Sequence, residues 1–256
     1  MEEALTMDFS TIYILWKRQL IKYFRSRSRI VGSLGQPILF LVAFGFGFGG
    51  VYQRAGGGSY MEFLAPGIIL MSVLFTAVFS GIDLIWDRQF GFLKETMVAP
   101  VPRLSIMLGK TLGGATVAVI QGLIVFLLTF LFGFHIASAP LLLVAFFAVV
   151  LVAILFTSLG VAIASTLEDM QGFQLIMNFL VMPTVFLSGA FFPLQGLPTL
   201  MEYVVKIDPL TYGVDAVRGA LIGISSFGMA LDFAILIGLS VAMLAIGSYL
   251  FEKVQI

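Results

Sequence analysis

The sequence predicts an all-α integral membrane protein with six transmembrane helices, and its composition carries most of that prediction. Hydrophobic residues make up 60% of the 256 residues, and charged residues make up only 11%. Soluble domains run at about 45–50% hydrophobic and about 25% charged residues. The polar residues are also gathered between long apolar stretches. So few charges could not cover this much apolar surface in water.

Six stretches are long enough to cross a bilayer. A spanning helix needs about 20 mostly apolar residues to cross a hydrocarbon core that is roughly 30 Å thick. The stretches that meet this requirement are Ile30–Val51, Phe63–Ile85, Leu112–Phe134, Leu141–Ser165, Phe173–Phe192 and Leu231–Phe251. Buried helices of a soluble protein are the alternative, but six of them in one short chain would lack a polar cover.

The basic residues predict the orientation of these spans. Eleven of the 14 lysines and arginines lie before the first span, between the second and third spans, or in the C-terminal tail. Only Arg54, Lys206 and Arg218 fall on the other side. Because cytoplasmic loops carry the excess of Lys and Arg, we expect a multi-pass protein of the cell (inner) membrane with both termini in the cytoplasm.

Residues 8–29 precede the first span and predict an amphipathic helix lying on the cytoplasmic face of the membrane. Either Asp8 or Ser10 is placed to cap its first turn. Its apolar face is formed by Phe9, Ile12, Tyr13, Trp16, Leu20, Tyr23 and Phe24, and its basic residues by Lys17, Arg18, Lys22 and Arg25. Aromatic residues opposite basic ones suit the membrane interface. The alternative is a plain positive anchor with no mechanical role.

Residues 188–228 lie between the fifth and sixth spans and fit neither a span nor a solvated loop. Pro193, Pro198 and Pro209 interrupt the segment, yet its other residues are largely apolar. Non-helical backbone at membrane depth must be covered by protein or line a water-filled cavity. We therefore expect short re-entrant helices that enter the outer leaflet.

Two glycine motifs resemble nucleotide sites but lack the required context. Gly45–Gly50 matches G-x-G-x-x-G, although it closes a predicted span and follows no strand. Gly109-Lys110-Thr111 resembles the end of a phosphate-binding loop, but Leu104 stands where the pattern needs glycine. His135 is the only histidine and there is no cysteine, so neither a metal site nor an enzyme is expected.

Four polar residues lie in or near the predicted spans. Asp83 and Asp232 are close to span ends, where we expect interface or capping roles. Gln121 and Asn178 lie deeper, where hydrogen bonds between helices are expected to contribute about 0.6–2 kcal/mol.

Two regions resemble the permeases of the ABC-2 transporter family. The first contains Arg88-x-x-Gly91, Leu93-Lys94-Glu95, Ala99-Pro100-Val101-Pro102-Arg103 and Gly109-Lys110. The second runs through Leu187-Ser188-Gly189-Ala190-Phe191-Phe192-Pro193, Leu197-Pro198, Asp208-Pro209-Leu210-Thr211-Tyr212 and Asp215-Ala216-Val217-Arg218. With the order of the elements, the resemblance covers nearly the whole chain as one domain, residues 1–256. Its compact form is similar to the drug- and lipid-export branch, which includes daunorubicin-resistance and nodulation permeases.

The resemblance implies a cytoplasmic coupling loop over residues 86–111 that contacts an ABC ATPase subunit. Its coupling residues would be Arg88, Gly91, Lys94, Glu95, Pro100 and Arg103, with Trp16, Lys17, Arg18 and Lys22 of the interface helix beside them. Pro100 and Pro102 would end a short helix near Ala99, because proline disfavours the helical conformation of the preceding residue. Without the resemblance, an ordinary solvated loop would be the simpler interpretation.

The resemblance also implies a transport pathway between two permeases, either two copies or this chain and a relative. Spans one, two and five would wall it, and an outer gate would include Asn178, Pro183, Phe186, Gly189, Phe191 and Phe192. ATP and Mg²⁺ would be bound by the partner ATPase, and no cofactor by this chain. Lipid is the surrounding partner, and no nucleic acid is expected.

Three function classes remain open on the sequence. The first is ATP-driven export of a hydrophobic or amphipathic molecule such as a drug, lipid or glycolipid. The second is an ion-coupled secondary transporter or channel, which would need a buried charge network near mid-membrane. The third is a non-catalytic membrane anchor for a soluble complex.

Overall fold

The computed structural model describes residues 7–56, 58–167 and 169–254, and this part of the chain consists of helices joined by turns and loops, with no strand. Its helices, in chain order, are α1 (Phe9–Arg25), α2 (Arg27–Arg54), α3 (Tyr60–Phe79), α4 (Ile82–Gln89), α5 (Phe92–Val98), α6 (Arg103–Leu131), the 3₁₀ turn η2 (Ala139–Leu141), α7 (Leu142–Thr166), α8 (Met170–Leu187), α9 (Thr199–Ile207), α10 (Pro209–Ile222) and α11 (Met229–Glu252). An all-α class is thus confirmed.

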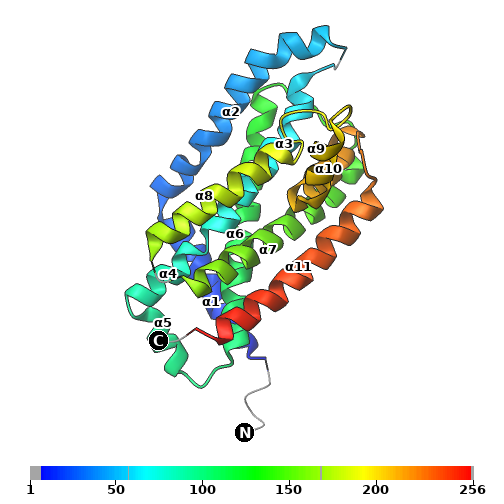
Figure 1. Ribbon diagram of the computed structural model, residues 1–256. Helices are drawn as coiled ribbons and strands as arrows, with labels where there is room; N and C mark the ends of the chain where they lie inside the picture. The colour runs from blue at the N-terminus through cyan, green and yellow to red at the C-terminus, as the bar shows by residue number, and fades with distance from the viewer. Residues whose placement is uncertain (1–6, 57, 168, 255–256) are drawn as a thin grey trace.

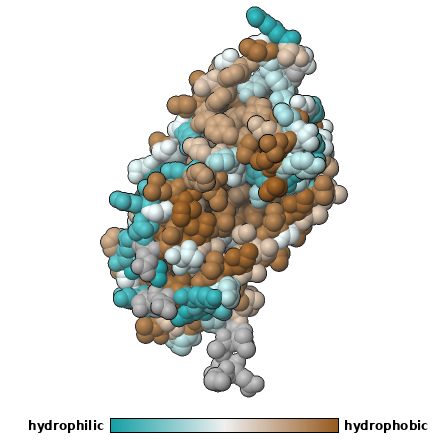
Figure 2. All heavy atoms as spheres, in the orientation of Figure 1, coloured by the Kyte–Doolittle hydropathy of each residue, from teal (hydrophilic) through white to brown (hydrophobic). Residues whose placement is uncertain are grey.

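In the part of the chain that the structure describes, six helical segments are long and apolar enough to cross a membrane, which confirms the predicted count. They run side by side in an elongated bundle (Figure 1), and hydrophobic residues cover most of the middle of the visible face (Figure 2). In the apolar 18-residue stretch of Tyr60–Gln89, 72% of the residues are buried, whereas in the corresponding stretches of α2 and α11 only 17% are buried. The second span is therefore the centre of the bundle, and the first and last spans lie at its edge.

The bundle has two distinct ends. One end holds α1, α4, α5 and the last turn of α11, and is called here the α5 end (Figure 1). The opposite end holds α9, α10 and the α2–α3 connection, and is called the α10 end. Short helices do lie between the fifth and sixth spans, and α10 is buried along almost its whole length. It packs against α3, α7 and α11.

Three predicted boundaries are wrong in instructive ways. The second span breaks at Ser80 and Gly81, so its end forms the separate helix α4. Gly81 lies against the backbone of Gly160 in α7, so a side chain at either position would collide with the other helix. The third span begins at Arg103, well before the predicted Leu112. Residues 86–111 are consequently mostly helical, because they comprise the end of α4, all of α5 and the start of α6. Only the short turns before and after α5 are not helical.

The fifth span also ends earlier than predicted. Helix α8 stops at Leu187, and Gly189 follows with a φ of +73°. This left-handed conformation favours glycine because it has no Cβ. The chain turns there, which removes Phe191 and Phe192 from the helix and places them in the following turn.

Helix α1 lies close along α6 because two glycines of α6 place no side chain between the two helices. A Cβ on Gly109 would meet Leu15 at 2.9 Å, and one on Gly113 would meet Gln19 at 2.7 Å. Small residues four apart on one helix face allow such close approach. Asp8 caps α1, as predicted, by accepting a hydrogen bond from the Ser10 backbone N–H at 2.9 Å.

Candidate functional site

Two aspartates one turn apart on α4 bind two basic residues one turn apart on α1. Arg18 donates two hydrogen bonds to Asp87, from Nη2 to Oδ1 at 2.9 Å and from Nη1 to Oδ2 at 3.1 Å. Lys22 Nζ donates to Asp83 Oδ1 at 2.5 Å. We call these four residues the α1–α4 clasp.

The clasp is desolvated on its acidic side. The side chains of Asp83 and Asp87 are each only 7% exposed, whereas those of Arg18 and Lys22 are about one third exposed. Lys110 of α6, 10% exposed, also donates to Asp87. A buried carboxylate loses several kcal/mol of hydration, so it persists as an ion only with partners of this kind. The clasp therefore ties α1 to α4 and, through Lys110, to α6.

Aromatic and polar contacts extend this attachment. The Arg18 guanidinium lies 3.6 Å from the centre of the Phe92 ring, which brings α1 against α5. Trp16 Nε1 donates to Thr116 Oγ1 at 3.0 Å, and the Tyr23 hydroxyl donates to Gln121 Oε1 at 2.9 Å. The predicted interhelical bond of Gln121 is confirmed, whereas Asp83 makes no helix cap and is buried against Lys22 of α1.

Two expectations for α1 need correction. Arg18 and Lys22 do not simply face water, because both point to α4. Trp16 and Tyr23 do not face lipid, because both contact α6. Lys17 alone among the four named interface residues is exposed. Helix α1 is thus packed on three neighbouring helices. The sequence indicates this pairing by spacing, because Arg18 and Lys22 are four residues apart and so are Asp83 and Asp87.

The six predicted coupling residues divide into two groups. Arg88 donates to the Leu167 carbonyl at 3.3 Å, and Arg103 donates to the Val254 carbonyl at 3.3 Å and to the Glu252 carbonyl. Both arginines therefore hold the end of another helix. Gly91 has a φ of +81° and makes the turn from α4 to α5. The exposed group on and after α5 comprises Lys94, Glu95 and Pro100.

Helix α5 presents an exposed surface at its end of the bundle. As predicted, it ends at Val98 with Ala99 as its C-cap. Leu93 is fully buried and anchors it, while Phe90 and Val98 are each 83% exposed on either side. Two large apolar side chains thus lie beside Lys94 and Glu95 in a small mixed surface.

The predicted gate residues are only partly brought together. Phe191 lies 5.3 Å from Phe186 of α8 and 5.4 and 5.2 Å from Phe40 and Phe44 of α2, measured between ring centres. The Tyr60 hydroxyl donates to the Phe191 carbonyl at 2.8 Å. An aromatic cluster therefore joins α2, α3, α8 and the following turn.

Other gate residues lie apart from this cluster. Asn178 and Pro183 are exposed on α8, and Phe192 is half-buried. Asn178 makes no hydrogen bond within residues 7–56, 58–167 and 169–254, so its predicted interhelical bond is not formed there. Gly189 belongs to the packing instead, because its carbonyl accepts from Arg218 Nη2 at 2.9 Å.

At the α10 end, two charged residues lie in environments that were not predicted from the sequence. Arg218 was expected in an outer connection, but it is 4% exposed and also donates to the Phe63 carbonyl at 3.1 Å. Burial lowers the pKa of Arg218 to about 10, so it stays charged at neutral pH. Asp232 is fully buried and neither of its oxygens has a hydrogen-bond partner in the described part of the chain. The predicted capping role of Asp232 is therefore wrong.

Comparisons with known proteins agree with this architecture. The family model of the ABC-2 type transporter matches residues 10–222. The chain is 28% identical over 260 residues to a protein of Cyanophora paradoxa named as transport permease ycf38, covering 95% of this chain and 88% of that protein. It is 29% identical over 220 residues to nodulation protein J of Rhizobium leguminosarum bv. trifolii, covering 82% and 78%. The chain belongs to the ABC-2 type transporter family.

The family match covers most of the features of this ABC-2 permease described above, and α11 lies beyond it. It begins within α1 and ends at the last residue of α10, so it includes the α1–α4 clasp, α5 and the aromatic cluster. The chain is thus a multi-pass membrane transport permease. In this permease Gly109 seats α1 on α6, which is a packing role for the glycine of the Gly109-Lys110-Thr111 motif.

Proposed function

We propose that this chain is the membrane subunit of an ATP-driven exporter whose ATPase is a separate protein. The single observation that carries the proposal is the exposed surface of α5 in a member of the ABC-2 family. Phe90 and Val98 lie outside the predicted spans, at the α5 end of the bundle, and each is 83% exposed. An ABC ATPase subunit is the partner that family membership implies for such a surface.

The contacts around α5 supply a route by which a partner's movement reaches the spans. Helix α5 continues into α4 through the Gly91 turn, and α4 is the continuation of the central span. The clasp then connects α4 to α1, and α1 lies along α6. Because buried ion pairs resist separation, a displacement of α5 would move α4 and α1 together. We propose this unit, with residues 86–111, as the coupling element.

We propose that the transport pathway forms between two permeases, either two copies of this chain or this chain and a relative. Helices α2 and α8 support this proposal, since 17% and 22% of their spanning windows are buried. They leave wide apolar faces for a second chain, and Asn178 supplies one polar group on the α8 face. Helix α3, by contrast, is covered by its own chain, so its part in the pathway wall would be small.

The proposed cargo is a hydrophobic or amphipathic molecule such as a drug, lipid or glycolipid, moved out of the cytoplasm. The proposed location is the cell (inner) membrane, with the α5 end in the cytoplasm. ATP and Mg²⁺ would be bound by the ATPase subunit. Nodulation protein J is a relative by sequence, and its name identifies no cargo for this chain.

The orientation has a direct test because the natural sequence contains no cysteine. Glu95→Cys on α5 and Gln195→Cys beyond α8 are single exposed sites at the two ends of the bundle. A membrane-impermeant maleimide applied to intact cells should label Gln195→Cys and leave Glu95→Cys unlabelled until the cells are opened. The reverse pattern would place α5 outside and remove the proposed ATPase surface.

The function is tested by co-expressing the chain with a candidate ABC ATPase encoded beside it. The expected result is a stable complex that hydrolyses ATP in lipid. Glu95→Arg on α5 should weaken the complex and lower hydrolysis, while Glu202→Arg, an exposed charge reversal on α9, should do neither. Transport of a solute by the purified chain without any ATPase would contradict the proposal and favour a secondary transporter or channel.

A further inference from the structure

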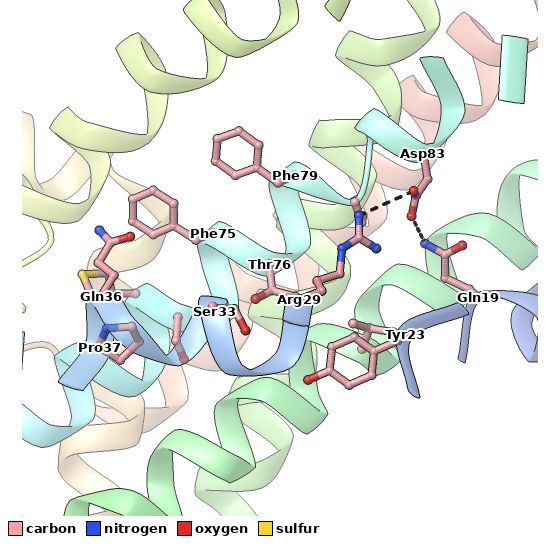
Figure 3. Close-up of a pocket in the computed structure, with 15 residues that line it drawn as sticks. Gln19, Tyr23, Arg29, Ser33, Gln36, Pro37, Phe75, Thr76, Phe79 and Asp83 are labelled. Atoms are coloured by element: carbon pink, nitrogen blue, oxygen red, sulfur yellow. Dashed lines mark hydrogen bonds and ion pairs between the residues drawn. The ribbon is translucent and has the colours of Figure 1, made fainter. Parts of the chain in front are cut away.

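A cavity of about 270 Å³ lies between α1, α2 and α3, beside the clasp. Figure 3 shows Arg29, Asp83 and Gln19 grouped at one end, with Phe75 and Phe79 on the α3 wall. The charged groups of the cavity thus lie together at one end, and two phenylalanines line its α3 wall. Most protein interiors are close-packed, so an unfilled space with this division of chemistry requires a reason.

Small residues on α2 keep the space open. Gly32 lines the cavity, and a Cβ at Gly32 would meet no atom within 4 Å. Ser33 occupies the next position and turns its hydroxyl back to the Ile30 carbonyl at 2.9 Å. Helix α2 is also the least supported span together with α11. The opening is therefore produced by the sequence of α2.

Arg29 is the group in the cavity with unused binding capacity. Asp83 already accepts hydrogen bonds from Lys22 and Gln19. Arg29 Nη2 forms an ion pair with Asp83 Oδ1 at 3.8 Å, beyond hydrogen-bond distance, and the Arg29 side chain makes no hydrogen bond with any residue that the structure describes. A guanidinium has five N–H donors. Its donors are thus available at the polar end of the cavity.

The charge around the cavity favours an anion. A second hollow, at neighbouring residues of α1 and the start of α2, is lined by Arg25 and Arg27 and by Arg18 and Lys22, the two residues paired in the clasp. Asp83 is the only acidic residue among the residues that line either space. Clustered basic residues near a membrane surface attract anionic groups, by about 1 kcal/mol for each Lys or Arg. Both the free donors and the surrounding charge therefore select a phosphate or carboxylate.

We propose that this cavity binds the anionic head group of an amphipathic molecule. Arg29 pairs with the anion, and Phe75 and Phe79 contact the first part of its apolar chain. A volume of about 270 Å³ is just below the roughly 300–1,000 Å³ range of whole small-molecule sites. The site consequently takes a head group and a few carbons, and the rest of the chain extends into the bilayer.

The first experiment measures retention of dodecyl phosphate by the full chain in dodecyl maltoside micelles, using native mass spectrometry. The detergent carries the same alkyl chain on a neutral head group and is in large excess. A retained dodecyl phosphate must therefore be held through its anionic head group. The wild type should retain one dodecyl phosphate. Arg29→Gln should weaken retention about tenfold or more, the size expected for one charge-assisted hydrogen bond. Arg29→Lys should restore part of it.

Two further variants make the result specific to the cavity. Arg54→Gln removes an exposed arginine at the other end of the same helix and should retain the probe as the wild type does. Ser33→Phe fills the cavity while leaving every charge in place, and it should also lose the probe. Equal retention by the wild type, Arg29→Gln and Ser33→Phe would overturn the proposal, as would an equal loss in Arg54→Gln.

The same chemistry has two sources, a lipid of the bilayer or the transported molecule. Phosphatidylglycerol that co-purifies at one per chain, and is lost in Arg29→Gln, would identify a resident lipid. A chain that purifies empty, binds dodecyl phosphate and then stimulates ATP hydrolysis by the bound ATPase would identify cargo. Only the assignment to cargo rests on the proposed export function. Because binding is measured on the chain alone, failure of that function leaves the binding result intact.

Discussion

Arg18 and Asp87, 69 positions apart in the sequence, form a two-pronged ion pair with both nitrogen–oxygen distances at or below 3.1 Å. The pair joins the helix before the first span to the helix that ends the second. The Asp87 carboxylate also accepts from Lys110 of the third span. One buried carboxylate therefore connects three segments that the sequence separates.

We expect Asp87→Asn to destabilise the protein by about 3 kcal/mol, because it leaves the buried Lys110 ammonium without a counter-charge. The measurement is unfolding in denaturant, followed by the fluorescence of Trp16 and Trp86 near the clasp. Glu202→Gln is the control, because its pair with Lys206 is about half exposed on both sides and should contribute less than about 1 kcal/mol. Equal losses in the two variants would contradict a special role for burial.

Gly109→Leu should separate α1 from α6. Its added side chain would collide with Leu15 and with the backbone of Ile12, which has little freedom to move. In the natural protein the backbone N of Asp8 lies 2.9 Å from the Oγ of Ser105. In a chain that carries both Asp8→Cys and Ser105→Cys, oxidation should therefore form a disulfide. Gly109→Leu should greatly reduce that disulfide.

The matched control is Gly47→Leu on α2, where a Cβ would meet nothing within 4 Å. It adds the same side chain to another spanning helix and should leave the disulfide yield unchanged. If Gly109→Leu also leaves it unchanged, α1 does not depend on the close approach of the two helices.

Stability should fall between about pH 4 and pH 7 because of Asp208. Burial raises the pKa of its carboxyl from 3.8 to about 7, although its Oδ1 accepts from the Leu210 backbone N–H at 3.0 Å. The folded protein thus holds this proton more tightly than the unfolded chain. The stabilisation by the protonated Asp208 carboxyl is complete below the pKa of the unfolded chain and is lost as the pH rises through about 7. The resulting loss in the free energy of unfolding is on the order of 4 kcal/mol.

Asp208→Asn should preserve the cap and remove this pH-dependent loss. We therefore expect its thermal midpoint to exceed that of the wild type at pH 8, with the gain shrinking as the pH is lowered to 5. Asp169→Asn changes the exposed cap of α8 in the same way and should show no such gain, because water solvates its carboxylate. A gain for Asp208→Asn that is constant with pH would mean that charge is not its cause.

Phe191→Ala should loosen α2 by removing the ring that contacts Phe40, Phe44 and Phe186. The expected loss is about 2 kcal/mol. It is smaller than the roughly 3–5 kcal/mol of a soluble core, because lipid is as apolar as the packed site and only the contacts are lost. Phe179→Ala, whose ring is 85% exposed, is the control and should cost little. Unfolding in mixed micelles measures both, and equal effects would contradict the packing role of the cluster.

The candidate sites were readable from the sequence to different degrees. The end of α5 at Val98 followed from Pro100 and Pro102, because proline acts on its immediate neighbour. The Asp8 cap was equally local. The roles of Arg103 and Arg218 were not readable, because each arginine binds carbonyls that are distant in the sequence. The cavity around Arg29 was not predicted either, because its walls are formed by helices that are separate in the sequence.

The sequence by itself determined that the chain lies in a lipid bilayer, how many spans it has and which family it belongs to. These properties depend on composition, length and local motifs, which hold wherever a segment lies in space. Only the tertiary structure decided that Asp83 and Asp87 pair with α1 and that Asp232 is buried with no hydrogen-bond partner among the described residues. Such outcomes depend on which helices meet. That in turn depends on close contacts such as Gly109 against Leu15, where the absence of one side chain sets the position of a whole helix.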